Sequence, residues 1–204
     1  SSAAFMGVNY VGNKALGDSV NTKVSLNKAN TTVPATSTAS ASSDVYDVSS
    51  IVENCMPSVV SITNVGTQEF RTIFGNYEQE SQSSGSGIII GQNDTELLIV
   101  TNNHVVSGAK ELSVYFNSDG QDADEDNVIS AKIKGTDADK DLAVIAVQLS
   151  DIPAETMSSI KTATVGDSSA LKVGEPVVAI GNAYGYGLSV TSGIVSALNR
   201  EVTV

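Results

Sequence analysis

The sequence predicts an all-β protein, and three observations lead to this prediction. The apolar residues gather in short runs rich in Val and Ile, which favour strands. Gly-rich, Asp-rich or otherwise polar segments separate these runs, as turns separate strands. No amphipathic pattern is longer than two helical turns. Regularly spaced short strands of this kind are typical of a β-barrel or a β-sandwich.

Residues 1–48 are predicted to precede the folded part of the chain. Residues 3–12 are small and apolar, which fits either the remnant of a membrane anchor or an ordinary short apolar stretch. No basic segment precedes them, so a complete signal peptide is not visible. Residues 31–44 consist mostly of Ser, Thr and Ala, and such a stretch buries too little apolar surface to offset its ordering entropy. We expect an extended linker here.

The folded part is expected to begin near Ser49 with a helical turn over residues 51–56, which Pro57 stops. The apolar runs that follow are predicted as strands, at residues 59–65, 87–91, 97–101, 111–116, 128–135, 142–147, 176–180 and 188–198. Two segments between them, the polar residues 68–84 and the acidic residues 117–127, are predicted as long loops.

Composition excludes several classes of function. Lys and Arg total 11 and Asp and Glu total 23, so the net charge of the 204 residues is −12. Such an acidic chain lacks the clustered cations that bind a nucleic-acid backbone. One Cys and one His cannot form an internal disulfide, a Cys-rich zinc site or a His-rich metal site. No run reaches the roughly 18–20 apolar residues that span a bilayer.

Two weaker candidates for chemistry have ordinary explanations. Acidic residues alternate within residues 122–127 and 137–142 as at the start of a calcium-binding EF-hand loop, but Asn127 and Leu142 occupy the glycine position. We expect neither segment to bind calcium. Cys55 lies among apolar neighbours and is expected to pack as a small hydrophobic residue rather than to act as a nucleophile.

His104 and Asp141 are the strongest catalytic candidates. His104, the only histidine, follows the predicted strand 97–101, and Asp141 directly precedes the strand 142–147. A carboxylate beside an apolar strand is partly desolvated, and an imidazole N–H is a suitable partner for it. Taken alone, each residue also has an ordinary interpretation, as a hydrogen-bonded histidine at a strand end and a solvated turn aspartate. Asp137 and Asp139 are rivals of Asp141 that we expect to be more exposed.

Six segments, taken in chain order, carry a family resemblance. They are M-P-S-V-V-S-I at 56–62, S-G-S-G-I-I-I at 84–90, T-N-N-H-V-V at 101–106, G-T-D-A-D-K-D-L-A-V-I at 135–145, V-G-E-P-V-V-A-I-G-N at 173–182 and V-T-S-G-I-V-S-A-L at 190–198. Together they resemble the HtrA (DegP-like) family of trypsin-like serine proteases. The resemblance implies an all-β, trypsin-like double β-barrel. Residues 49–150 would form a complete first barrel, and residues 151–204 the connection and the first strands of a truncated second barrel.

By residue matching, His104 takes the position of the general base and Asp141 that of the aspartate that orients it. A serine hydroxyl is a weak nucleophile until a base removes its proton. An imidazole does this near neutral pH, and a carboxylate on its other nitrogen fixes the tautomer and stabilises the imidazolium. We therefore predict a His104 ring nitrogen within about 2.6–3.2 Å of an Asp141 carboxylate oxygen.

The third member of the triad is not identified. The family's nucleophile lies in a G-N-S-G-G segment, and no such segment occurs in these 204 residues. Ser84, Ser86, Ser107 and Ser192 each precede a glycine, but none lies in a Gly-rich turn downstream of Asp141. We expect the nucleophile to lie beyond Val204 and the 204 residues alone to be inactive.

The resemblance further implies an endopeptidase that cleaves unfolded or misfolded proteins in protein quality control. It also implies an extracytoplasmic location, with a membrane anchor at the N-terminus, and assembly as a homotrimer. No metal and no cofactor are expected. Two alternatives stay open, a catalytically inactive protease-like binding or scaffold module and an unrelated acidic extracellular β-domain.

Overall fold

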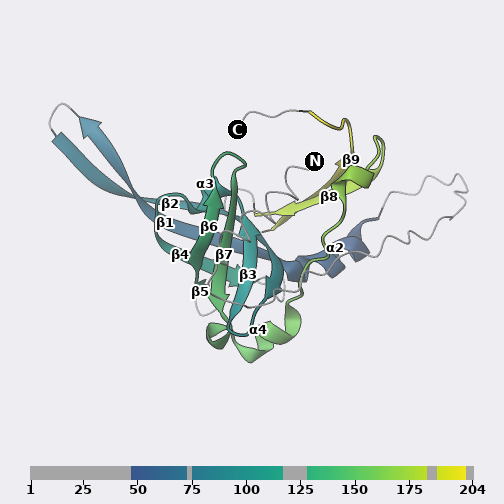
Figure 1. Cartoon of the computed structure of the whole chain (residues 1–204), viewed down its shortest axis with the longest axis horizontal. Coiled ribbons are helices and arrows are strands. Elements are labelled where there is room, and N and C mark those ends of the chain that lie inside the picture. Colours follow the sequence, from purple (N-terminus) through teal and green to yellow (C-terminus); the bar gives the residue numbers. More distant parts are fainter. Residues whose placement is uncertain (1–46, 73–74, 117–127, 183–187, 201–204) are drawn as a thin grey trace, which may run out of the picture.

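The computed structural model describes residues 47–72, 75–116, 128–182 and 188–200 (Figure 1). Its elements, in chain order, are α2 (Ser49–Cys55), the 3-10 turn η1 (Met56–Ser58), β1 (Val59–Thr72), β2 (Gly75–Gln92), β3 (Glu96–Thr101), α3 (Asn103–Val106), β4 (Ala109–Phe116), β5 (Val128–Ser130), β6 (Lys132–Asp137), β7 (Leu142–Gln148), η3 (Leu149–Asp151), α4 (Ala154–Ser159), η4 (Ser168–Ala170), β8 (Pro176–Gly181) and β9 (Ser189–Ile194). Every apolar run predicted as a strand coincides at least in part with one, and the run 128–135 is divided between β5 and β6. The prediction of an all-β fold is confirmed.

The larger sheet is antiparallel and has the strand order β5-β4-β1-β2-β3-β7-β6. Its two outer strands, β5 and β6, are successive parts of one segment that is interrupted only at Ala131. The Ala131 amide donates to the Leu112 carbonyl of β4 at 2.8 Å, while β6 pairs with β7 on the other side. The sheet therefore curls until its edges meet in a single segment, which protects them from pairing with another chain.

The core lies inside this curled sheet. Side chains alternate between the two faces of a strand, so every second residue of the apolar runs points inward. The largest fully buried side chains are Phe116, Ile62, Ile89, Leu97, Ile99, Ile145, Val60, Val106, Val114 and Val147. The packing leaves no room at Gly87, where a Cβ would lie 2.6 Å from Cγ2 of Ile99 and 2.8 Å from Cδ1 of Ile62.

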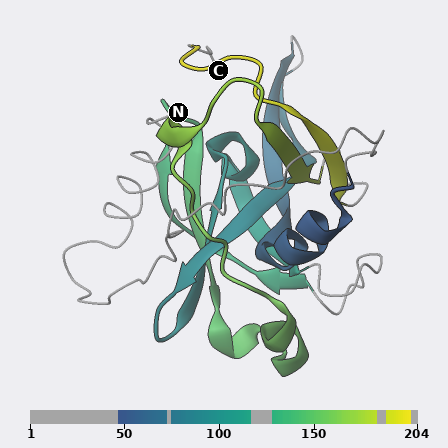
Figure 2. The same cartoon turned by 90° about the vertical axis from the view of Figure 1, so that its right-hand side faces the viewer.

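The second sheet is the β8–β9 hairpin, paired from Pro176↔Ile194 to Gly181↔Ser189. The connection to it passes through η3 and α4, runs along the surface of the larger sheet, and then reaches η4 and β8 (Figure 2). Two backbone hydrogen bonds attach this connection, from Lys161 N to Pro57 O at 3.0 Å and from Ala163 N to Ile89 O at 2.8 Å. The hairpin is thereby held beside the larger sheet.

The prediction of a loop at residues 68–84 is wrong. Residues 68–72 and 75–84 continue β1 and β2 as a hairpin, with pairs that run from Thr67↔Glu80 to Thr72↔Gly75. Figure 1 shows this hairpin extending away from the barrel as a long two-stranded ribbon. The backbone N–H and C=O groups of two paired strands hydrogen-bond to each other whatever the side chains are. A polar hairpin of this kind therefore leaves no apolar run in the sequence from which it could be predicted.

The expected packing of Cys55 is also wrong, because its thiol is exposed and no residue of α2 is buried. The predicted acidic loop 117–127 and residues 1–46 lie outside the described residues. Among the helices that the structure describes, none has the length and apolar character needed to cross a membrane.

Candidate active site

The ends of two neighbouring strands bring His104 and Asp141 together. β3 and β7 are antiparallel and paired from Glu96↔Gln148 to Thr101↔Ala143, so the end of β3 adjoins the start of β7. His104 lies in α3, the helical turn that follows β3, and Asp141 ends the turn 138–141 that leads into β7. Strand pairing alone therefore places the two residues on the same edge of the barrel.

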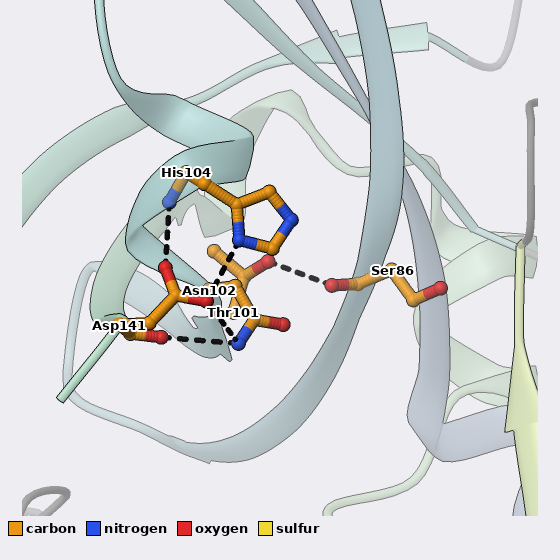
Figure 3. Close-up of polar contacts among 5 residues, drawn as sticks. All are labelled: Ser86, Thr101, Asn102, His104 and Asp141. Carbon is orange, nitrogen blue, oxygen red and sulfur yellow. Dashed lines mark hydrogen bonds and ion pairs between the residues drawn. The ribbon is translucent and has the colours of Figure 1, made fainter. Parts of the chain in front are cut away.

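The carboxylate of Asp141 contacts His104 with both of its oxygens (Figure 3). His104 Nδ1 lies 2.7 Å from Oδ2, and the His104 backbone amide donates to Oδ1 at 2.9 Å. The predicted contact is present, within the predicted range of distances. The side chain of Asp141 is 14% exposed and that of His104 is 71% exposed, so the imidazole remains accessible while its partner is shielded.

Asp141 adopts a backbone conformation that is uncommon for residues other than glycine, with φ of 50°. Asp is among the residues that tolerate this left-handed region best. The Asp141 amide donates to the Ala138 carbonyl at 3.3 Å within the same turn. Left-handed residues persist where the surrounding structure holds them, and such positions cluster at functional sites.

The surroundings of Asp141 hold it in its ionised form. Burial alone would raise the pKa of this carboxyl, but hydrogen bonds from the His104 amide, the His104 ring and Asn102 outweigh burial, and the pKa is lowered. A carboxylate has no proton to donate, so His104 Nδ1 carries the hydrogen between the two groups. Nε2 is then left with the lone pair that can accept a proton.

The rival Asp137 is less exposed than predicted. Its side chain is 8% exposed, because it forms an ion pair with Lys140 Nζ at 2.8 Å and accepts from the Lys140 amide at 3.1 Å. These contacts to Lys140 lower the pKa of the Asp137 carboxyl. Asp137 therefore stabilises the turn that presents Asp141. Asp139 is exposed, as expected.

Sequence reasoning missed a set of polar residues that support the site. Thr101 Oγ1 donates to the Ser86 carbonyl at 2.7 Å (Figure 3). Ser86 Oγ in turn accepts from the Asn182 amide at 2.6 Å. Ser86 thus joins the edge of the barrel that carries His104 to the β8–β9 hairpin. Within the described residues, the ring of His104 has no hydrogen bond to a serine hydroxyl.

Two asparagines also contact the site. Asn102 Nδ2 donates to the Asp141 carbonyl at 3.0 Å and to Oδ2 at 3.2 Å. Asn64 of β1 donates through Nδ2 to the carbonyls of Val105 at 2.9 Å and Ser107 at 3.1 Å. Asn64 lies on the face of β1 that points into the core, as do Val60 and Ile62. A polar residue at such a position was a signal for a buried hydrogen-bond donor.

Within the part of the chain that the structure describes, no group of three or more His, Cys, Asp or Glu side chains could hold a metal ion.

Comparison with known proteins identifies the family. Residues 85–203 match the model of the trypsin-like peptidase domain. The chain is 39% identical over 170 residues to the serine protease Do-like HtrA of Bacillus subtilis, a match that covers 80% of this chain and 35% of that protein. It is 35% identical over 164 residues to the periplasmic pH-dependent serine endoprotease DegQ of Escherichia coli, covering 74% of this chain and 32% of that protein.

Solved structures agree with the sequence matches. The HtrA-type protease AlgW with decapeptide superposes with a TM-score of 0.52 and 26% identity, over 74% of this chain and 45% of that one. A variant of the same protease with decapeptide gives a TM-score of 0.61 and 26% identity, over 76% of this chain and 46% of that one. The chain spans about a third of the length of the curated relatives it matches. With more than half of its residues matched by the family model, the chain belongs to the trypsin-like peptidases, and its relatives place it in the HtrA family.

Proposed function

We propose that this chain contributes the general base and its orienting acid to a serine endopeptidase of the HtrA type. The contact between His104 Nδ1 and Asp141 Oδ2 is the observation that supports this proposal most directly. The carboxylate is partly buried and the imidazole is open to solvent, which is the asymmetry that a base acting on an incoming group requires.

In the proposed mechanism, Nε2 of His104 accepts the proton of a serine hydroxyl as the oxygen attacks the peptide carbonyl. The imidazolium that forms is stabilised by Asp141, which keeps its negative charge throughout. The same ring then returns the proton to the leaving amine, and a second cycle with water releases the acyl group. We propose that the serine, and the backbone donors that stabilise the oxyanion, belong to a part of the protein outside these 204 residues.

We further propose the division of the chain that the resemblance implies. Residues 1–48 form an anchor remnant and linker, residues 49–150 the first barrel, and residues 151–204 the connection and the first strands of the second barrel. The curled sheet from β1 to β7 and the separate β8–β9 hairpin support this division.

The proposed substrates are unfolded or misfolded proteins, as part of protein quality control. Support comes from the two HtrA-type neighbours, whose structures contain a decapeptide. We propose an extracytoplasmic location because relatives such as DegQ are named as periplasmic. A membrane tether at the N-terminus and a homotrimeric assembly belong to the same proposal, and fractionation of cells and sedimentation of the purified protein test them.

The decisive experiment uses the protein expressed from its complete gene and an unfolded protein such as reduced casein as substrate. His104→Ala and Asp141→Asn should each lower kcat/KM by at least about a thousandfold, as losses in other triads do. Asp139→Asn removes an exposed carboxylate from the same turn and should leave kcat/KM unchanged. Full activity in either His104→Ala or Asp141→Asn would refute the proposed roles. A complete protein with no activity at all would instead be the inactive binding module.

A further inference from the structure

Asn102 occupies the N-cap of α3 but does not cap it. An N-cap asparagine ordinarily uses its side-chain oxygen to accept an amide from the first helical turn. Asn102 makes no such bond. The amide that needs an acceptor, that of His104, is satisfied by Oδ1 of Asp141 at 2.9 Å instead. Asp141, which is 37 residues away from His104 in the sequence, therefore caps α3 in place of Asn102.

The side chain of Asn102 is directed to that same aspartate. Its Nδ2 lies 3.0 Å from the Asp141 main-chain carbonyl and 3.2 Å from Oδ2 (Figure 3). Both partners are acceptors, and only the nitrogen end of an amide side chain carries hydrogens, so the orientation of the amide follows from its partners. Asn102 thus contacts Asp141 at its backbone and at its carboxylate.

These contacts make α3 and the turn 138–141 hold each other in place. Asp141 caps the helix that carries His104, and Asn102, the residue directly before this helix, holds Asp141. Oδ2, the oxygen that faces His104 Nδ1, is also the oxygen to which Asn102 donates. Since Asp141 has a left-handed backbone, a donor on its carbonyl helps to hold a conformation that residues other than glycine seldom adopt.

We propose that Asn102 is a positioning residue, which holds the carboxylate of Asp141 in register with the His104 ring by donating to both ends of Asp141. Asn102 does not touch the reacting atoms and acts through Asp141. The inference rests on the proposed function for its catalytic consequence, whereas the contact with Asp141 can be tested without any enzymatic activity.

The first test uses the 204-residue chain and follows the Asp141 carboxyl by carbon-detected NMR during acid titration. Asn102→Ala should make Asp141 titrate at higher pH than in the parent, because a donor to the ionised form is lost. Asn102→Asp keeps the shape of the side chain but puts a second carboxylate in place of the donor, and should raise the pKa of Asp141 further. Asn103→Ala changes the same residue type one position along α3 and should leave the titration unchanged. A merely structural role of Asn102 would not move this titration.

The second test measures kcat and KM of the complete protein. Asn102→Ala should lower kcat about tenfold with KM nearly unchanged, a change of about 1.4 kcal/mol, which is close to the value of one hydrogen bond. Asn103→Ala should match the parent.

The role of Asn102 would be overturned if Asp141 titrated identically in the parent, Asn102→Ala and Asn103→Ala. It would also be overturned if the titration moved while kcat did not, in a protein that His104→Ala inactivates. If His104→Ala kept full activity, the proposed function would fail, and the titration would still decide whether Asn102 holds Asp141. The failures of the two proposals are thus distinguishable.

Discussion

Replacement of Asn64 should destabilise the fold by an amount that can be worked out from its contacts. The Asn64 side chain is buried, and its Nδ2 donates to the carbonyls of Val105 and Ser107. Asn64→Ala removes both bonds, each worth about 1 kcal/mol net, and leaves the buried Val105 carbonyl without this donor, which adds about 1 kcal/mol or more. Oδ1 of Asn64 is buried with no partner among the described residues, which is itself destabilising. Removal of this atom in Asn64→Ala therefore offsets part of the lost stability. We expect the free energy of unfolding to fall by about 2 kcal/mol.

The assay is equilibrium unfolding in urea, followed by circular dichroism. With an m-value of about 2 kcal/mol/M, a loss of this size lowers the midpoint by about 1 M. The matched control is Asn54→Ala, since Asn54 is exposed on α2 and its side chain donates, among the described residues, to Ser50 of its own helix. Its effect should stay within about 0.5 kcal/mol. Equal midpoints for Asn64→Ala and Asn54→Ala would refute the reasoning.

The same chain allows three further predictions. Ser86→Ala removes the acceptor of the Asn182 amide, so this amide should exchange with solvent faster, and unchanged exchange by NMR would refute the link between the sheets. Gly85→Ala places a Cβ 2.5 Å from a methyl group of α3 and should cost about 1–3 kcal/mol in urea unfolding, whereas Gly166→Ala, with open space around it, should cost much less. The pKa of Asp141 lies below its ordinary 3.8 in the folded chain, so ionised Asp141 stabilises the fold above that pH and this contribution is lost as the pH falls through the lowered value. Asp141→Asn should therefore flatten the dependence of stability on pH in this acidic range, and an unchanged pH profile would contradict the assignment.

The strands were predictable from the sequence because short apolar runs rich in Val and Ile favour strands, and polar or Gly-rich segments separate these runs. The outer part of the β1–β2 hairpin escaped prediction for the opposite reason. Its strands at 67–72 and 75–80 are recognised from their pairing with each other, and this pairing leaves no mark in hydropathy. Hydropathy was also misleading at Cys55. Its apolar neighbours in the sequence suggested that it is buried, but no residue of α2 is buried.

Within the site, His104 and Asp141 were predictable because each stands at the end of an apolar strand and within a motif of its family. Asn102 belongs to the same motif as His104, and Ser86 belongs to the family motif at 84–90, yet their contacts were not predicted. What they contact depends on which strands are neighbours and in which register, as in the pairing of Thr101 with Ala143. Sequence identifies the residues that react more readily than those that hold them.

The position of His104 is determined mainly by contacts that are distant in the sequence. α3 has four residues, and a helix that short is unstable alone because its terminal amides and carbonyls lack partners within the helix. At its start, Asp141 accepts the His104 amide, and at its end, Asn64 donates to the Val105 and Ser107 carbonyls. One of these residues comes from the turn before β7 and the other from β1, on opposite sides of β2 and β3 in the sheet order. The sheet must therefore curl before α3 can be held at both ends, so the orientation of the imidazole depends on formation of the barrel.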